Sequence, residues 1–170
     1  YQLVLNIYQE NRPLQRVPLM RVVVAGRERQ FALAEPIEPV EAIFQGGILL
    51  LGYQGTARAY RPGDTLSVTL FWQPQAVLQI DYTAFVQLLG PDGQVYGQMD
   101  AQPGGGRYPT SHWSPGEIIK DTYSFVISAD APAGAYRLIT GFYYFETGER
   151  VPVEPDGASF VTLFDLAVKP

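Results

Sequence analysis

The sequence contains no cysteine, a single histidine and only two lysines, Lys120 and Lys169. Without cysteine the chain has neither disulfides nor thiolate metal sites, and one histidine is too few for a typical zinc site. The net charge of -5 provides no basic stripe to neutralise phosphates, which argues against a nucleic-acid partner. Apolar runs such as Ile48-Leu49-Leu50-Leu51 are far shorter than the roughly 20 residues of a membrane-spanning helix. We therefore expect a chain that does not itself span a membrane.

Alternation of apolar and polar residues dominates the sequence, and helical periodicity is scarce. In residues 65–72, four apolar side chains fall on one face, and residues 123–127 repeat the pattern. Further candidate strands, separated by turn sequences, are 47–54, 80–90, 94–100, 134–145 and 159–168. Short strands at this spacing predict an all-β fold, an Ig-like antiparallel β-sandwich with Greek-key connections. We expect seven strands over residues 42–170 and no helix longer than one turn.

Two similar turn sequences each precede a candidate strand. Arg61-Pro62-Gly63-Asp64 and Ser114-Pro115-Gly116-Glu117 place proline and glycine at the central positions that a type II turn requires. Pro62, Gly63, Pro115 and Gly116 are therefore assigned a structural role. Asp64 and Glu117 are expected to cap their turns or to meet an arginine, rather than to form a catalytic pair.

Residues 130–136 read Asp-Ala-Pro-Ala-Gly-Ala-Tyr and predict a tight turn that opens a strand. Gly134 and Tyr136 lie where a tyrosine corner has its turn and its phenol, which bonds back to a backbone group. We interpret both residues as structural. A catalytic phenol at Tyr136 is the alternative interpretation.

The chain contains an internal repeat. Residues 1–8 match 136–143, residues 16–19 match 150–153 and residues 31–34 match 164–167, in the same order. We therefore expect residues 1–36 to be the last strands of a preceding sandwich-like repeat, in a longer protein, and residues 37–170 to be a complete sandwich. The apolar face formed by Leu3, Leu5 and Ile7 is expected to pack on the complete sandwich. A homodimer through residues 1–36 is the alternative.

Residues 101–117 concentrate three consecutive glycines, the histidine and one of the two tryptophans. The sequence after Gly104-Gly105-Gly106 lacks the lysine and the helix of a phosphate-binding loop. One hypothesis is a ligand-binding platform for sugars, because aromatic faces with polar edges stack on sugar rings. Its residues would be Arg107, Tyr108, His112 and Trp113. The favoured interpretation is a long crossover between two sheets, with Trp113 covering one end of the core.

Catalytic and metal-binding patterns are weak. Ser111 and His112 are neighbours in one loop, which rarely allows the geometry of a catalytic triad, even with Asp100 or Asp121 as a third member. Asp100 and Asp121 are also candidate calcium ligands, although no EF-hand spacing is present. With Asp81 they are candidate glycosidase carboxylates, but nothing in the spacing pairs them. We expect no catalytic residue, no metal and no cofactor in this chain. A small hydrolase centred on His112 is the alternative function.

Several long phrases together resemble a known family. These are residues 44–53, residues 60–64 leading into 70–72, residues 81–89, and residues 105–110 continuing to 113–117. Over about residues 42–155 the chain resembles the C-terminal β-sandwich of bacterial multi-spanning membrane glycosyltransferases of the protein-mannosyltransferase-like type. The resemblance implies that a membrane-embedded part of a parent protein performs the transfer from a lipid-linked sugar donor. It also implies an extracytoplasmic, non-catalytic accessory module that contacts a glycan or a partner, or sets a spacing.

Overall fold

The computed structural model describes residues 2–10, 12–21, 28–55 and 58–170. These residues form β-strands and one 3-10 turn, η1 (Thr110–His112), which confirms the all-β fold. Alternation explains why: in β6 (Thr65–Pro74), Leu66, Val68 and Leu70 are fully buried, while Thr65 and Ser67 are exposed. Among the residues described, no helix has the length and apolar character needed to cross a membrane.

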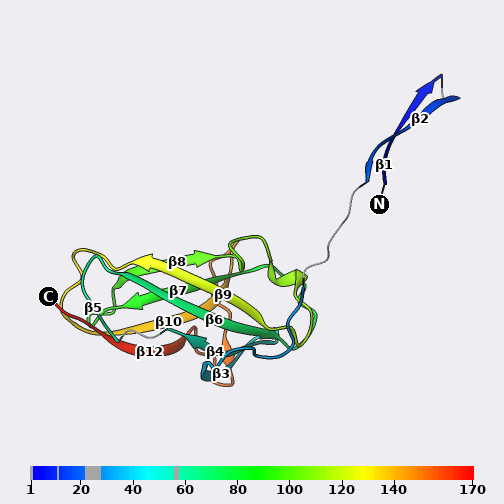
Figure 1. The fold of residues 1–170 in the computed structure, drawn as a ribbon. Helices are drawn as coiled ribbons and strands as arrows, with labels where there is room; N and C mark the ends of the chain where they lie inside the picture. The colour runs from blue at the N-terminus through cyan, green and yellow to red at the C-terminus, as the bar shows by residue number, and fades with distance from the viewer. Residues whose placement is uncertain (1, 11, 22–27, 56–57) are drawn as a thin grey trace.

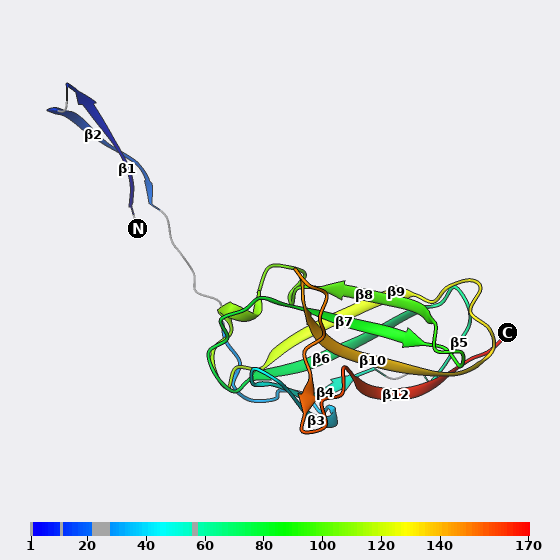
Figure 2. The same cartoon turned by 180° about the vertical axis from the view of Figure 1, so that it is seen from behind.

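Two five-stranded sheets pack face to face (Figure 1), and Figure 2 shows the same layers from behind. The first sheet has the order β5 (Ala59–Tyr60), β12 (Val161–Val168), β10 (Gly134–Tyr144), β7 (Tyr82–Leu89) and β8 (Val95–Ala101). The second has the order β11 (Val153–Glu154), β3 (Glu38–Phe44), β4 (Ile48–Gln54), β6 and β9 (Ile119–Val126). The connections β6–β7, β8–β9 and β9–β10 pass between the sheets, as in Greek-key sandwiches.

The expected count of seven strands is wrong, because the sandwich also contains β3, β5 and β11. β5 and β11 have two residues each and show no alternation. β3 contains Pro39 and Glu41, and its register shifts between Pro39 and Ala42, where Glu41 has a φ of 56°. β11 pairs only with Ile43 and Phe44, so Pro39 lies where no second neighbour needs its missing N–H.

Aromatic rings fill the centre of the core. The ring of Phe142 from β10 lies 5.4 Å from Phe44 and 4.6 Å from Trp72, which belong to the opposite sheet. Tyr82 from β7 closes the group, 6.1 Å from Phe142. Edge-to-face and tilted contacts of this kind add to the area burial of each ring. The core is therefore held by side chains from both sheets.

β1 (Gln2–Gln9) and β2 (Arg12–Arg21) form a separate antiparallel hairpin, which lies away from the sandwich in Figures 1 and 2. Its apolar face is open, since Leu3, Leu5 and Ile7 are 50%, 48% and 39% exposed. The expectation that this face packs on the complete sandwich is therefore wrong. Tyr1, Asn11 and residues 22–27, which also belong to the predicted unit 1–36, lie outside the described residues.

Residues 29–36 contact the sandwich through polar groups instead. The backbone N–H of Ile118 donates to the Gln30 carbonyl at 2.7 Å, and the Lys120 ammonium pairs with Glu35 at 2.8 Å. Gln54 of β4 donates to the Pro36 carbonyl at 2.8 Å. This segment thus follows the end of the sandwich where β9 begins.

Candidate functional site

The glycine-rich stretch is a crossover from β8 to β9 in the opposite sheet, which confirms the favoured interpretation of residues 101–117. Gly104, Gly105 and Gly106 all have φ near +60° to +80°, a region that residues with a Cβ rarely adopt. The Gly104 N–H donates to the Asp121 carboxylate at 3.1 Å, and the Gly106 N–H donates to the Gln102 carbonyl at 2.8 Å. These donors therefore point into the protein rather than toward a phosphate.

A buried carboxylate, Glu117, holds the rest of this crossover. The Tyr108 hydroxyl lies 2.9 and 2.8 Å from its two oxygens, and the Ser114 N–H donates to it at 3.0 Å. The Trp113 indole donates to the Tyr108 carbonyl at 3.0 Å, and the Arg29 guanidinium lies 3.8 Å from Glu117. Such a carboxylate needs these partners because an unpaired buried charge is costly. Glu117 is thus a structural residue of the loop.

These contacts do not allow the expected aromatic platform. The rings of Tyr108 and Trp113 are buried, whereas Arg107 and His112 are exposed. The Arg107 Nε lies 3.4 Å from the Gly104 carbonyl, within its own turn. The platform hypothesis for Arg107, Tyr108, His112 and Trp113 is therefore wrong in its geometry, because the two largest rings face the core.

Ser111 and His112 do not have the arrangement of a catalytic pair. The Ser111 N–H donates to the Asp81 carboxylate at 3.1 Å. The side-chain hydrogen bond of Ser111 lowers the pKa of Asp81, and the nearby His112 lowers it less. Ser111 thus faces the Asp81 carboxylate, whereas a triad requires its hydroxyl to bond to the imidazole.

Asp121 accepts hydrogen bonds that hold the local structure. It accepts from the Tyr123 hydroxyl at 2.6 Å in addition to the Gly104 N–H. Burial raises the pKa of Asp121, while the bonds from Tyr123 and Gly104 lower it. Within the part of the chain that the structure describes, no three His, Asp or Glu side chains form a group that could hold a metal ion.

The two proline-glycine turns have the same internal bonds. In 61–64 the Arg61 N–H donates to the Asp64 carboxylate at 2.7 Å, and the Asp64 N–H donates to the Arg61 carbonyl at 3.0 Å. Glu117 and Ser114 make the equivalent pair. The two carboxylates therefore close separate turns.

Tyr136 has the geometry of a tyrosine corner. Its ring is buried, and its hydroxyl donates to the Pro132 carbonyl at 2.8 Å. Gly134 allows the close approach of Pro91, whose Cγ lies 3.2 Å from the position that a Cβ would take. The Tyr136 hydroxyl is thus hydrogen-bonded to the backbone of its own turn.

A small pocket of about 190 Å³ lies on the outer face of the first sheet. Gln87 of β7, Asp100 of β8 and Tyr143 of β10 belong to adjacent strands, and Arg150 bridges to Tyr143 from the following loop. Phe85 forms its floor, lying against Gly141, where an added Cβ would be 2.7 Å from the ring. The lining residues are Phe85, Gln87, Asp100, Tyr143, Gly148 and Arg150. We call this the outer-face pocket.

The outer-face pocket combines a fixed cation with an acceptor. The Arg150 guanidinium stacks on Phe85, with its Cζ 4.3 Å from the ring centroid, and donates to the Gln87 side chain at 2.9 Å. Partial burial raises the pKa of Asp100, whereas hydrogen bonding to Tyr143 and the charge of Arg150 lower it. The two ion pairs found among the described residues involve other groups, so Asp100 and Arg150 share the pocket without direct pairing.

The sequence reasoning missed most of this pocket. Asp100 was considered only as a calcium ligand or catalytic carboxylate, and Gln87 and Arg150 were not singled out. The available signal was a polar residue, Gln87, at an outward position of an otherwise apolar strand. Arg150 lies in a loop that folds back against β10, and no sequence pattern predicts this contact.

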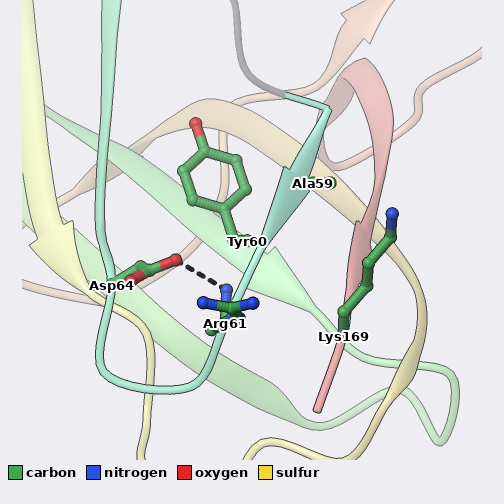
Figure 3. Close-up of a pocket in the computed structure, with 5 residues that line it drawn as sticks. All are labelled: Ala59, Tyr60, Arg61, Asp64 and Lys169. Carbon is green, nitrogen blue, oxygen red and sulfur yellow. Dashed lines mark hydrogen bonds between the residues drawn. The ribbon is translucent and has the colours of Figure 1, made fainter.

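A second hollow, of about 290 Å³, lies at the end of the sandwich that contains the C-terminus. Figure 3 shows the Asp64 carboxylate turned toward the Arg61 backbone, while the Lys169 side chain extends away from it. Burial raises the pKa of Tyr60 at its side. One oxygen of Asp64 closes its turn, beside the cations of Arg61 and Lys169.

No protein-family model and no curated protein match this chain. Solved structures that match it include the C-terminal domain of Wzt, with 15% identity over 79% of this chain and 81% of that chain, and a TM-score of 0.46. The CARDB domain of a Pyrococcus furiosus protein in complex with di-metal ions is 13% identical, covering 77% of this chain and 97% of that chain, with a TM-score of 0.42. Spo0M, a sporulation control protein from Bacillus subtilis, is 14% identical, covering 73% of this chain and 49% of that chain, with a TM-score of 0.39. At such identities the likeness concerns the β-sandwich fold alone.

Proposed function

We propose that this chain is a non-catalytic, extracytoplasmic accessory module of a membrane glycosyltransferase, and that it contacts the glycan. The parent enzyme is inferred from the resemblance of residues 42–155 to the C-terminal sandwich of protein-mannosyltransferase-like transferases. In that arrangement the membrane-embedded part performs the transfer, and the sandwich holds or orients a sugar chain outside the cytoplasm.

The non-catalytic role is supported by the contacts of the reactive side chains. Glu117 and Asp121 hold the crossover, Asp81 accepts from the Ser111 N–H, and the Tyr136 hydroxyl bonds to its own turn. A general acid or base must reach a reacting group, and each of these groups already has an internal partner. The observation that carries the proposal is that these candidate catalytic groups, with the exception of His112 and Asp100, already have partners within the protein.

Contact with a glycan is supported by the outer-face pocket. It offers the Arg150 guanidinium and the Asp100 carboxylate on the outer face of a rigid sheet, above the buried ring of Phe85, which Arg150 covers. Sugar sites likewise use a few placed polar groups to fix the orientation of the ring. The pocket therefore gives the module a ligand-binding face away from the crossover.

The proposal is tested on the purified 170-residue protein in two assays. We expect no hydrolysis of chromogenic esters or glycosides above the rate of a His112→Ala variant, and we expect retention of oligosaccharides on a glycan array. Hydrolysis that His112→Ala abolishes would instead support the hydrolase alternative. A wild-type protein that retains no glycan would limit the module to spacing or to a protein partner.

A further inference from the structure

We propose that the outer-face pocket binds one neutral sugar ring by a pair of adjacent hydroxyl groups, between Arg150 as donor and Asp100 as acceptor. This inference rests on the proposed glycan contact and adds to it the site, the ligand class and the residues. It differs from the platform expected in the crossover, which lies in another part of the fold.

Arg150 is held in place as a donor. Its guanidinium is stacked on Phe85, and one of its five N–H groups donates to Gln87, which in turn donates to Gln98 at 3.3 Å. These bonds link the loop of Arg150 to β7 and β8. The remaining N–H groups are available to a ligand oxygen, and little side-chain entropy is lost on binding because the fork is already fixed.

Asp100 supplies the acceptor. Its carboxylate lies near Tyr143, which lowers its pKa, and it has lone pairs for a ligand hydroxyl. Each hydroxyl of a sugar both donates and accepts. Two adjacent hydroxyls can therefore satisfy a carboxylate on one side and a guanidinium on the other, and charged partners make such hydrogen bonds strong.

The size and charge of the pocket select the ligand. Pockets for drug-sized ligands measure roughly 300–1,000 Å³, so a volume of about 190 Å³ suits a single ring rather than a chain. The charges of Arg150 and Asp100 cancel, and the carboxylate repels an anionic ligand. These properties favour a neutral hexose unit over a uronic acid or a sugar phosphate.

A second aromatic residue lies in the loop that borders the pocket. Phe145 is 71% exposed and belongs to the same turn as the pocket residue Gly148. An exposed phenylalanine in a turn lowers solubility and adds nothing to the core. Its ring can instead stack on the next sugar ring of an oligosaccharide. The site then binds one ring deeply and its neighbour at the rim.

The test is an array of neutral hexose oligosaccharides with their uronic-acid counterparts, probed with the 170-residue protein. We expect the wild type to bind neutral members, and Arg150→Ala and Asp100→Ala each to weaken binding at least about tenfold, the usual effect of losing one charge-assisted hydrogen bond. Arg137→Ala is the matched control, because Arg137 is an exposed arginine of β10 outside the pocket. It should change binding less than about twofold.

The outcomes separate the site from the general function. Neutral binding that survives both pocket variants overturns this site and leaves glycan contact standing. Preference for uronic acids overturns the assigned ligand class, and absence of any binding by the wild type overturns both proposals. Unchanged unfolding midpoints of the variants in urea would show that a loss of binding is local to the pocket. If Arg150→Ala does not fold, Arg150→Lys is the substitute, because lysine keeps the charge but lacks the planar guanidinium; it should still weaken binding.

Discussion

β1 and β10 have matching sequences but lie in opposite environments. Leu3 and Ile7 of β1 are 50% and 39% exposed, whereas their counterparts Leu138 and Phe142 of β10 are fully buried. Both strands alternate apolar and polar residues, and both are extended in the structure. What differs is the surroundings, because β10 pairs with β7 and β12 and faces a second sheet, while β1 pairs only with β2.

This difference shows that an alternating sequence does not by itself determine burial. Alternation indicates which side chains share a face, but the partner strands decide whether that face is buried. A two-stranded unit removes too little apolar area from water to be more than marginally stable alone. The hairpin thus has the sequence of a core strand without the core, which agrees with the expectation that residues 1–36 end a preceding repeat. That assignment stays a prediction.

Matched truncations of the two strands should give the largest difference. Phe142→Ala removes a ring that contacts Phe44 and Trp72, and we expect it to lower the free energy of unfolding by about 3–5 kcal/mol. Ile7→Ala should change it by less than about 0.5 kcal/mol. Urea unfolding followed by tryptophan fluorescence measures both, since Trp72 and Trp113 are buried in the sandwich. Equal effects would show that the hairpin is part of the same cooperative core.

Stepwise deletion tests where the contribution of the N-terminal segment lies. Removing residues 1–27 should leave the unfolding midpoint unchanged, because the hairpin faces solvent. Removing residues 1–36 should lower the free energy of unfolding by about 1 kcal/mol, through the lost Gln30–Ile118 bond. The exposed Glu35–Lys120 pair should add little to this loss. The comparison fails if the shorter deletion already unfolds the chain.

A tyrosine in each region allows a finer comparison. Tyr136→Phe removes the hydroxyl that donates to the Pro132 carbonyl and should cost about 1 kcal/mol. Tyr8→Phe changes an exposed ring of the hairpin and serves as the control. Chemical denaturation of both variants provides the measurement. No stability difference between them would argue against a tyrosine corner at this position.

The fold could be predicted because its cause is local. Alternation in segments such as 65–72 and turn residues such as Gly63 and Gly116 need no knowledge of distant contacts. β3 escaped prediction because Pro39 and Glu41 interrupt its pattern, and its pairing depends on β4. The short strands β5 and β11 arise only from their neighbours in the sheet.

The candidate site could not be predicted in the same way. The outer-face pocket joins Gln87, Asp100 and Arg150, which are far apart in sequence and meet only through sheet register and the return of one loop. The crossover was conspicuous for its composition, yet Tyr108 and Trp113 face inward. Unusual composition there reflects the demands of a long, tightly folded connection.

The smallest expected effect concerns Asp121, a buried carboxyl group of the sandwich. Burial raises the pKa of Asp121 above its ordinary value of 3.8, so the folded protein binds this proton more readily than the unfolded chain. Its contribution to stability is therefore present below the unfolded pKa and is lost as pH rises through the folded pKa. The stability of Asp121→Asn relative to the wild type should accordingly rise as the pH rises from the ordinary pKa of 3.8 through the raised pKa of the folded protein.

The asparagine keeps an acceptor for the Gly104 N–H but changes the partner of the Tyr123 hydroxyl. This change of hydrogen-bond partner adds a pH-independent constant to the difference in unfolding free energy between the two proteins. Only the slope of that difference with pH reports the titration of Asp121. Urea unfolding of both proteins at several pH values measures the slope. A flat difference for Asp121→Asn would mean that the bonds from Gly104 and Tyr123 fully offset burial.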